Sequence, residues 1–337
     1  MIRTINKPYL LFLGDIQGDP NAKTAFGLRD WCPQDCLAQL RLPGCTVDLG
    51  LQELCPGEAA AAGAKSMVIA VAPIGGALSP HWVPHLLRAL EAGLDLVSGL
   101  HDRLNSIPAL SEASARLGRA LHDVRHPEGA FAVATGRKRS GKRLLTVGTD
   151  CALGKKYTAL ALAAALQAKD IKADFRATGQ TGILIAGSGI PLDAIVADFI
   201  AGAAESISPD NDVTHWDIIE GQGSLFHPAY AGVTLALVHG SQPDALVMCH
   251  DPTRKHINGY PNYPLPDLKT AVRRYLEAAY LTNPNAKFVG VSLNTSHLSS
   301  ADRARELERV EDALGLPCFD PLKQGIEAVI ARLSEFA

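Results

Sequence analysis

The stretch VGTDCALGKKYTAL, Val147 to Leu160, decides the fold of the second half of this chain. An apolar strand runs into Gly148, a short polar loop follows, and Gly154 and Lys155 open a helix-forming run. Backbone N–H groups of such a loop converge on an anion, and the positive end of the helix dipole adds to them. Strand, loop and helix in this order predict a phosphate-binding P-loop. The residues expected to hold the phosphates are Gly148, Thr149, Asp150, Cys151, Gly154, Lys155, Lys156 and Tyr157.

Two features separate this loop from that of nucleotide hydrolases. Gly148 and Gly154 enclose five residues, where the usual pattern encloses four. Lys156 follows Lys155, at the position where those enzymes place the Ser or Thr that ligates Mg²⁺. An ammonium group there removes a metal ligand and adds a charge that repels the ion. The sequence therefore predicts a polyphosphate site without a metal, and it disfavours Mg²⁺-dependent transfer of a γ-phosphoryl group.

Short apolar runs alternate with helix-period segments along the whole chain. Apolar strands separated by helices indicate a parallel sheet that is covered on both faces. We therefore expect an α/β protein, with an N-terminal Rossmann-like domain and a C-terminal α/β/α domain like that of P-loop NTPases. The expected strands are Tyr9–Leu13, Met67–Ala72, Leu94–Val97, Phe131–Ala134, Leu144–Gly148, Ala173–Ala177, Trp216–Glu220, Ala245–Cys249, Phe288–Leu293 and Cys318–Phe319. The expected helices are Trp82–Ala92, Leu110–His122, Lys155–Lys169, Leu192–Glu205, Ala229–His239, Leu268–Leu281, Ser300–Leu314 and Gln324–Phe336.

The boundary between the two domains is expected at the basic run GRKRSGKR, residues 136–143. Five of its eight residues are Lys or Arg, and two are Gly. Glycine and solvated charge are typical of a linker. The alternative is that part of this run lies beside the phosphate site, because the next strand leads into the loop. We place the domains at residues 1–136 and 137–337.

Composition and charge exclude several classes of protein. A chain of 337 residues is long enough for two domains at about 150 residues each. With 47 % apolar residues it can bury sizeable cores, so it is not mainly disordered. Its 32 Lys and Arg nearly balance 35 Asp and Glu. This balance argues against a binder of nucleic acid or of membrane surfaces and favours small-molecule substrates.

The cysteines and the apolar runs indicate where the protein works. The seven Cys form no CxxC pair and lack the usual zinc spacings, which favours a reduced, cytoplasmic protein with free thiols. The longest apolar run, Ala159–Leu166, is shorter than the roughly 20 residues that span a bilayer. We expect no membrane segment and no secretory leader.

Two short motifs resemble a known P-loop ligase. The GTD…GK spelling of the loop is similar to the GTDxxxGKT of dethiobiotin synthetase. The EGQGS of Glu220–Ser224 resembles that family's EGxGG at the end of a central strand, and both motifs occur in the expected order.

A closer resemblance covers most of the chain. It is carried by VAPIGGAL (Val71–Leu78), ALEAGLDLVSGLHDRL (Ala89–Leu104), the loop itself, ATGQTG (Ala177–Gly182), IIEGQGSL (Ile218–Leu225) and the stretch His250–Pro264. Together these pieces resemble a two-domain family, formerly of unknown function, with Rossmann-like and P-loop domains. Its characterised members are D-glutamate N-acetyltransferases of the DgcN type. The resemblance implies acetyl-CoA as donor and an acidic D-amino acid, most simply D-glutamate, as acceptor.

This implication fits the chemistry of the loop. Coenzyme A carries a pyrophosphate and a 3′-phosphate and needs no Mg²⁺ at its reacting end, so a loop without the metal-binding hydroxyl suits it. Lys156 and the basic run from Arg137 to Arg143 are candidates for the extra phosphate. The apolar N-terminal helices allow a homodimer.

Two residues are candidates for the base that deprotonates the amine of the acceptor. Glu220 ends an apolar strand at the carboxyl edge, where open α/β sheets bind ligands. His227 follows seven residues later and is the second candidate. Cys151 lies just ahead of a helix N-terminus, a position that lowers a thiol pKa. A covalent acetyl-cysteine is conceivable there, but a packing role with direct attack by the amine is simpler.

Cationic and polar residues after neighbouring strands are candidates for binding the acceptor's carboxylates. The alternative for all of them is an ordinary polar loop. The irregular stretch from Asp251 to Asp267 is long enough to favour a functional loop, against a surface excursion or a dimer contact. The candidate residues are Arg176, Thr178, Gln180, Thr181 and Arg254.

Two other functions remain open at this point. One is an ATP- and Mg²⁺-dependent ligase or kinase that resembles dethiobiotin synthetase. The other is a non-catalytic nucleotide sensor. Dependence on Mg²⁺ separates the ligase from the acetyltransferase, and turnover of an acyl donor separates either enzyme from the sensor.

Overall fold

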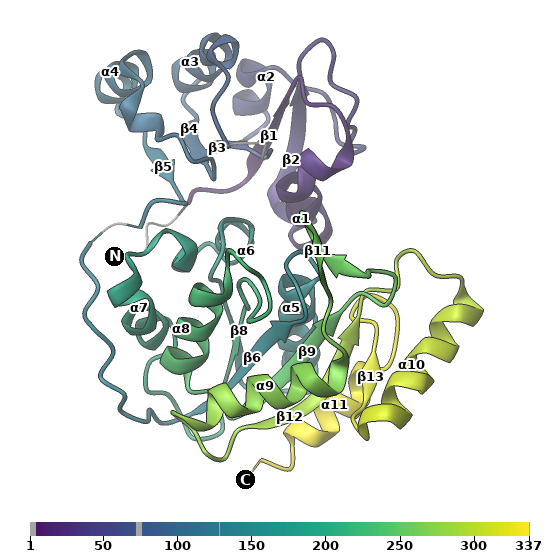
Figure 1. Ribbon diagram of the computed structural model, residues 1–337. Coiled ribbons are helices and arrows are strands. Elements are labelled where there is room, and N and C mark those ends of the chain that lie inside the picture. Colours follow the sequence, from purple (N-terminus) through teal and green to yellow (C-terminus); the bar gives the residue numbers. More distant parts are fainter. Residues whose placement is uncertain (1–4, 72–75, 128, 337) are drawn as a thin grey trace. The chain divides into compact units, whose positions relative to one another are not determined.

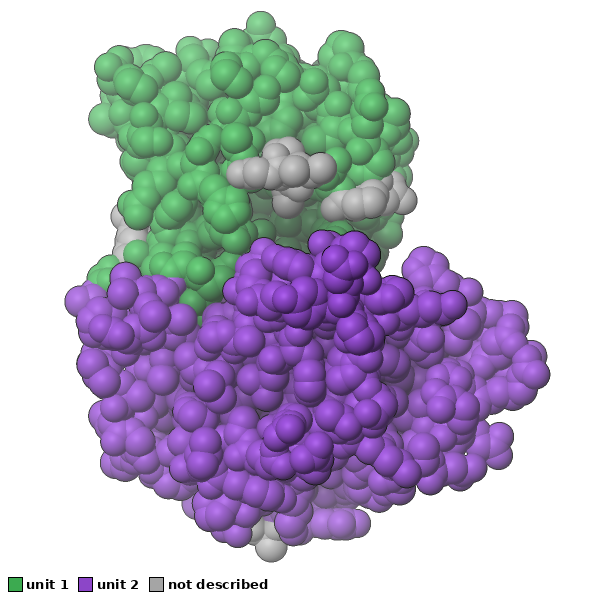
Figure 2. Space-filling model, viewed as in Figure 1, with its two compact units in different colours: residues 1–129, 179–194 green, residues 130–178, 195–337 purple. Residues whose placement is uncertain are grey.

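The computed structural model describes residues 5–71, 76–127 and 129–336, so part of the VAPIGGAL motif lies outside the described residues. The chain forms two compact units, coloured separately in Figure 2. Unit 1 comprises residues 1–129 and 179–194, and unit 2 comprises residues 130–178 and 195–337. The sequence predicts one division after residue 136, whereas here the segment 179–194 belongs to unit 1 although it follows the phosphate loop in the chain.

Unit 1 is built on a parallel five-stranded sheet in the order β2-β1-β3-β4-β5. Its central strands read as continuous apolar runs because helices cover the sheet. The strands are β1 (Tyr9–Gly14), β2 (Cys36–Arg41), β3 (Ser66–Ile69), β4 (Asp95–Ser98) and β5 (Leu121–Asp123). The α-helices are α1 (Lys23–Trp31), α2 (Pro56–Ala61), α3 (Val83–Glu91), α4 (Pro108–Leu117) and α6 (Gln180–Ala186).

Helix α6 is bound into unit 1 by apolar packing and hydrogen bonds. Leu184 is fully buried in the same apolar cluster as the strand residues of this sheet. The hydroxyl of Tyr9, on β1, donates to the carbonyl of Leu184 over 3.5 Å, and the hydroxyls of Thr24 and Thr181 are 3.1 Å apart. These contacts assign α6 to unit 1.

Unit 2 is built on a parallel six-stranded sheet in the order β13-β12-β9-β6-β8-β7. A small antiparallel pair, β10 (His256–Ile257) with β11 (Tyr260–Pro264), lies in the stretch expected to be irregular. The sheet strands are β6 (Lys142–Gly148), β7 (Ala173–Arg176), β8 (Trp216–Ile219), β9 (Ala245–His250), β12 (Lys287–Leu293) and β13 (Cys318–Phe319). The α-helices are α5 (Lys155–Gln167), α7 (Ile200–Ile207), α8 (Ala231–Ser241), α9 (Leu268–Tyr280), α10 (Ser300–Leu314) and α11 (Ile326–Leu333).

Helices cover the sheet of unit 2 in two layers. Helices α7, α8 and α9 pack side by side along one face, while α5 and α11 pack together against the sheet (Figure 1). The core between α5, α11 and the strands is apolar, and Ala159, Leu162 and Leu166 supply the buried stripe of α5. A parallel sheet between helical layers confirms the expected α/β class.

Most strands of the sheet cores agree with the prediction, but one does not. Phe131–Ala134 forms no strand, and Val133 is 64 % exposed. A strand of a parallel sheet covered on both faces must be buried. Four consecutive apolar residues alone were therefore not sufficient to predict a strand here. The short strand β2 was missed because Cys36–Arg41 mixes polar with apolar residues. The short strand β5 was missed because its first residues were assigned to the end of a helix expected to reach His122.

The basic run of residues 136–143 does not lie beside the phosphate loop. Its last residues begin β6, whereas the loop follows the other end of this strand, so about 20 Å of extended chain separates the two. Arg139 and Arg143 are buried and donate to backbone carbonyls, among them those of Gly240 and Ser140. The alternative that part of this run lies beside the phosphate loop is therefore wrong, and the buried Arg139 and Arg143 anchor the chain to the amino-terminal edge of the sheet.

Across the described residues, no helix is both long and apolar enough to cross a membrane.

Candidate active site

Three neighbouring strands of unit 2 bring the candidate residues together. Strand β6 lies between β9 and β8 in the sheet, and all three run in the same direction. The loops that follow them, Gly148–Gly154, Glu220–Tyr230 and Asp251–Asp267, therefore meet at one carboxyl edge, which is where open α/β sheets bind ligands.

The loop after β6 presents a row of unused backbone donors. Ala152 and Gly154 adopt left-handed conformations, with φ of 52° and 103°. Such a conformation is strained for alanine and readily adopted by glycine. No hydrogen bond among the described residues uses the N–H groups of Ala152, Leu153, Gly154 or Lys155. Consecutive free N–H groups at a helix N-terminus form a site for an anion.

Lys155 places its ammonium group inside this loop. Its Nζ donates to the carbonyl of Asp150 over 2.8 Å, and the side chain is buried. Burial lowers the pKa of Lys155 because the charged form loses its hydration, and nearby Cys151 partly opposes this effect. A phosphate in the loop would place a negative charge next to this buried ammonium group.

Asp150 and Arg254 stabilise the conformation of the loop through hydrogen bonds and an ion pair. The Asp150 carboxylate is fully buried and accepts from Cys151 N over 2.6 Å, from Asn258 N over 2.8 Å and from Arg254 Nη1 over 2.7 Å. The same Nη1 also donates to the carbonyl of Cys151 over 2.7 Å. Arg254, predicted as an acceptor-binding residue, thus lies beside the loop with its guanidinium directed at the loop itself.

Ser224 and Tyr275 fix the start of the loop, and neither of them was assigned a role from the sequence. Both hydroxyls donate to the carbonyl of Gly148 over 2.8 Å, and Leu225 N donates to the Tyr275 hydroxyl over 3.1 Å. Burial raises the pKa of Tyr275 to about 12. Tyr275 lies on the buried stripe of α9, and a phenol at such a position was the available signal, because buried tyrosines need a hydrogen-bond partner.

Glu220 follows β8 and contacts Thr178, which lies just after the neighbouring strand β7. Its Oε2 accepts from Thr178 N over 2.9 Å, and the Thr178 hydroxyl donates to the Glu220 carbonyl over 2.6 Å. Gln222 donates to the same hydroxyl over 3.0 Å. Gly221 is required beside it, because a Cβ there would lie 1.7 Å from the carbonyl of Thr146. Glu220 and Thr178, both predicted site residues, are therefore brought together.

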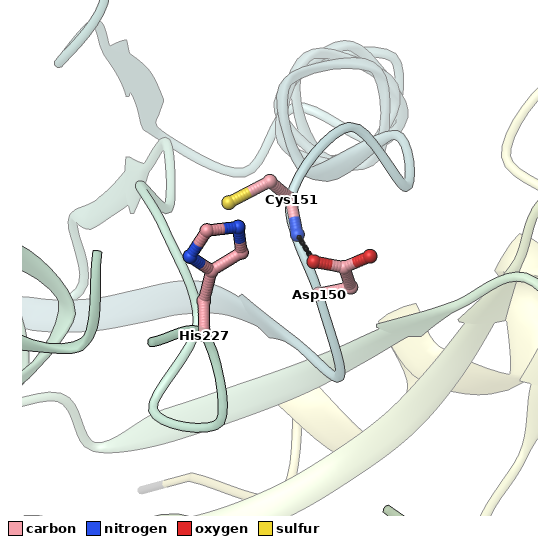
Figure 3. A group of neighbouring side chains, drawn as sticks. All are labelled: Asp150, Cys151 and His227. Atoms are coloured by element: carbon pink, nitrogen blue, oxygen red, sulfur yellow. Dashed lines mark hydrogen bonds between the residues drawn. The ribbon is translucent and has the colours of Figure 1, made fainter. Parts of the chain in front are cut away.

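His227 and Cys151 face each other across this edge, as Figure 3 shows. A ring nitrogen of His227, Cys151 Sγ and a carboxylate oxygen of Asp150 lie within 4.8 Å of one another. Burial raises the pKa of the Cys151 thiol, whereas Lys155 opposes the increase. The expectation that the helix N-terminus favours a thiolate is therefore wrong, because burial is the larger effect.

The other predicted acceptor residues have partners of their own. Arg176 donates from Nε to Asp217 over 2.7 Å and lies 3.0 Å from Asp174. Gln180 and Thr181 belong to unit 1, where Gln180 accepts from Arg125 over 2.9 Å.

Among the predicted loop residues, Thr149 and Lys156 also have identified contacts. The Thr149 hydroxyl lies 2.9 Å from His250 Nδ1. The Lys156 ammonium lies 4.8 Å from the centre of the Tyr157 ring, a distance at which cation and ring attract each other.

Among the described residues, two groups of side chains have metal-like donor atoms, and a guanidinium group contacts each of them. Asp150, Cys151 and His227 form the first, with Arg254 on the Asp150 carboxylate. Asp174, His215 and Asp217 form the second, where Arg176 contacts both carboxylates. These guanidinium groups already balance the negative charge of the carboxylates, which a metal ion would otherwise do. The donor sets are therefore a poor fit for a divalent ion.

The fold and the site define a two-domain α/β protein with a P-loop in which Lys156 stands at the position of the usual metal-binding hydroxyl. The chain belongs to the DUF1611 family of proteins. The Rossmann-like domain of that family matches residues 40–127, and its P-loop domain matches residues 131–330. The family resemblance inferred from the motifs is thereby confirmed.

Two relatives with a named activity match this chain over almost its whole length. A D-glutamate N-acetyltransferase from Tritonibacter scottomollicae is 52 % identical over 98 % of this chain and 99 % of its own length. One from a Pseudoalteromonas species is 50 % identical over the same shares. The crystal structure of a DUF1611 family protein from Anabaena variabilis has a TM-score of 0.83 and 32 % identity, and the match covers 97 % of this chain and 100 % of that one.

Proposed function

We propose that this protein transfers the acetyl group of acetyl-CoA to the amine of D-glutamate. The observation that carries the proposal is identity of 50 % or more, over nearly the full length, to two proteins named D-glutamate N-acetyltransferase. The chemistry of the loop agrees with it, since unused N–H groups and the Lys155 ammonium suit the phosphates of coenzyme A. Lys156 in place of the metal-binding hydroxyl argues against the ligase alternative.

In the proposed reaction, Glu220 removes a proton from the ammonium group of D-glutamate, with His227 as the second candidate base. The free amine attacks the thioester carbonyl, and the C–S bond breaks as the tetrahedral intermediate collapses. The second proton of the attacking nitrogen passes to the departing sulfur, so that coenzyme A leaves as the thiol. N–H groups near the site stabilise the oxyanion. Because Glu220 lies at the same sheet edge as the phosphate loop, the pantetheine arm has to fold back toward the loop for the thioester to reach it.

The proposed acceptor site uses groups predicted from the sequence: Arg176, Thr178, Gln180, Thr181 and Arg254. Of these, Thr178 contacts Glu220. The two arginines are tied to carboxylates of the protein, so binding of a substrate carboxylate there requires that they share or exchange a partner.

The proposal also covers the compartment and the oligomeric state of the enzyme. We infer a cytoplasmic homodimer that acts on small molecules. All seven cysteines are free, which fits a reducing compartment. The homodimer is inferred from the apolar helices that the sequence shows in the N-terminal half.

The test is a direct assay of the purified protein. Acetyl-CoA and D-glutamate should yield N-acetyl-D-glutamate and one equivalent of free thiol, read by mass spectrometry and a thiol reagent. L-Glutamate and a neutral D-amino acid serve as acceptor controls. Absence of product with every acceptor would contradict the proposed function.

Removal of divalent metal ions should leave the acetyltransferase activity unchanged. The residue after Lys155 is an amine, and Arg254 and Arg176 already neutralise the acidic groups that resemble metal sites. The measurement is the turnover rate before and after treatment with EDTA. Loss of activity that Mg²⁺ restores would favour a ligase or kinase instead.

Cys151→Ser should retain most of the turnover rate, and wild-type protein should form no acetyl adduct. Burial keeps the Cys151 thiol protonated, and the loop uses backbone N–H groups that serine preserves. The measurement is the intact mass of the wild-type protein after incubation with acetyl-CoA alone, together with the kinetics of the variant. A mass increase of one acetyl group at Cys151 would establish a covalent route.

A further inference from the structure

His227 is held in one orientation beside the phosphate loop. Its side chain is 2 % exposed. The ring stacks on Tyr230 with centroids 4.5 Å apart and lies nearly perpendicular to the Tyr260 ring, with centroids 5.1 Å apart. Its Nδ1 accepts a hydrogen bond from the backbone N–H of Ala229 over 3.1 Å. A flipped ring would face this N–H with a carbon atom, so the hydrogen bond also selects the flip.

This hydrogen bond determines which nitrogen carries the proton. A neutral imidazole has one N–H donor and one acceptor nitrogen. Because Nδ1 accepts from Ala229, the proton of the neutral ring is on Nε2. A general base acting through Nε2 would need the lone pair there, and the ring could offer it only if the Ala229 N–H lost its acceptor.

The Nε2 atom is directed at the phosphate loop. Figure 3 shows the ring nitrogen farther from the His227 backbone turned toward Cys151, which is a residue of the loop. Within the described part of the chain, no hydrogen bond uses Nε2. Among the described residues, the Nε2 atom is not one of the fully enclosed polar atoms that lack a partner, so it stays accessible although the side chain as a whole is buried. A donor that is directed at the loop and is not enclosed by the protein can reach a ligand held there.

The charges around Nε2 identify the ligand as an anion. The unused N–H groups of residues 152–155 belong to the same loop, and the cations of Lys155 and Arg254 flank it. Both oxygens of Asp150 are already occupied by donors of the protein, so this carboxylate does not turn the group into a cation site. Every free polar group identified here is a donor.

We propose that His227 is a neutral hydrogen-bond donor, through Nε2, to the phosphate held by the loop, and that it is not the base. The assignment rests on the proposed function in one respect: the phosphate is taken to be that of coenzyme A. It leaves proton abstraction to Glu220. It also predicts that the loop holds inorganic pyrophosphate with the help of His227.

The experiment compares three substitutions at this position. In His227→Gln the side-chain amide nitrogen falls near the position of Nε2, whereas in His227→Asn it falls near Nδ1, and His227→Ala has no donor. Dissociation constants for acetyl-CoA and for inorganic pyrophosphate are measured by calorimetry, with kcat from the acetyl-transfer assay. Tyr230→Phe is the matched control, because it keeps the stacked ring.

We expect His227→Ala and His227→Asn to raise both dissociation constants about tenfold, which corresponds to about 1.4 kcal/mol. His227→Gln should stay near the wild-type value, and kcat should change less than binding in all three variants. Unchanged binding together with an equal loss of kcat in all three variants would instead identify His227 as the base.

A measurement on wild-type protein keeps the proposal testable if a variant does not fold. Nitrogen-15 shifts of the His227 ring should show the Nε2–H tautomer, and pyrophosphate should perturb Nε2. The Nδ1–H tautomer would overturn the proposal. Wild-type protein that binds neither pyrophosphate nor acetyl-CoA would overturn both the loop assignment and the role of His227. Wild-type binding that no variant weakens would overturn the role of His227 alone.

Discussion

Lys155→Ala should weaken the binding of acetyl-CoA by about one to two orders of magnitude. The Lys155 ammonium is buried against the Asp150 carbonyl, in a place where a bound phosphate oxygen would meet it with little competition from water. A hydrogen bond between charged groups is worth about 1.5 to 3 kcal/mol, so the dissociation constant should rise about 10- to 150-fold. Calorimetry with acetyl-CoA measures it directly.

Lys169→Ala is the matched control for this experiment. Lys169 lies two residues beyond the end of α5, the helix that Lys155 begins, and it is exposed. Its removal should change neither affinity nor thermal unfolding. A Lys155→Ala protein that folds and binds acetyl-CoA as the wild type does would refute the assignment of the phosphates to this loop.

Arg254→Ala should both destabilise unit 2 and abolish tight binding of acetyl-CoA. The Asp150 carboxylate is fully buried and would lose its one charged partner, while the carbonyls of Cys151 and Ala152 would lose a donor. Removal of one member of a buried ion pair costs about 3 to 5 kcal/mol. Urea unfolding measures the stability, and calorimetry measures the affinity.

A double-mutant cycle separates this effect from loss of side-chain packing. Asp150→Asn combined with Arg254→Ala should cost less than the sum of the two single changes, because the buried charge is then absent. Arg273→Ala on α9 is the control, since its pair with Glu277 is exposed and should contribute little. Additive effects of Asp150→Asn and Arg254→Ala would show that the pair does not organise the loop.

Much of the fold could be predicted because local patterns dictate it. The helix Ser300–Leu314 and the strand Cys318–Phe319 agree with the prediction at both ends. The placement of α6 could not be predicted in this way. Its residues read as a short apolar helix after β7, and nothing local distinguishes packing on the nearer sheet from packing against Tyr9. That choice depends on contacts between residues far apart in the chain.

The site was predictable to the extent that backbone geometry determines it. Strand, loop and helix placed Lys155 and Gly154 where an anion site requires them, and Glu220 follows a neighbouring strand. The roles of Arg254 and Tyr275 depend on which atoms meet across 100 residues or more, and a charge or a phenol in the sequence does not say whether it faces a ligand or the protein. The predicted lowering of the Cys151 pKa was wrong for a related reason, because the burial that raises this pKa depends on the whole fold.

The return of α6 to unit 1 has a consequence for synthesis on the ribosome. Domains made early in translation generally fold before later ones emerge. Here the sheet of unit 1 is complete at β5, but Leu184, which fills its core, is made only after β6, α5 and β7. The nascent first unit therefore waits with an apolar surface uncovered while the first strands of the second unit are already being made. The two units finish folding in an interleaved order, and a translational pause between β5 and α6 would expose that surface for longer.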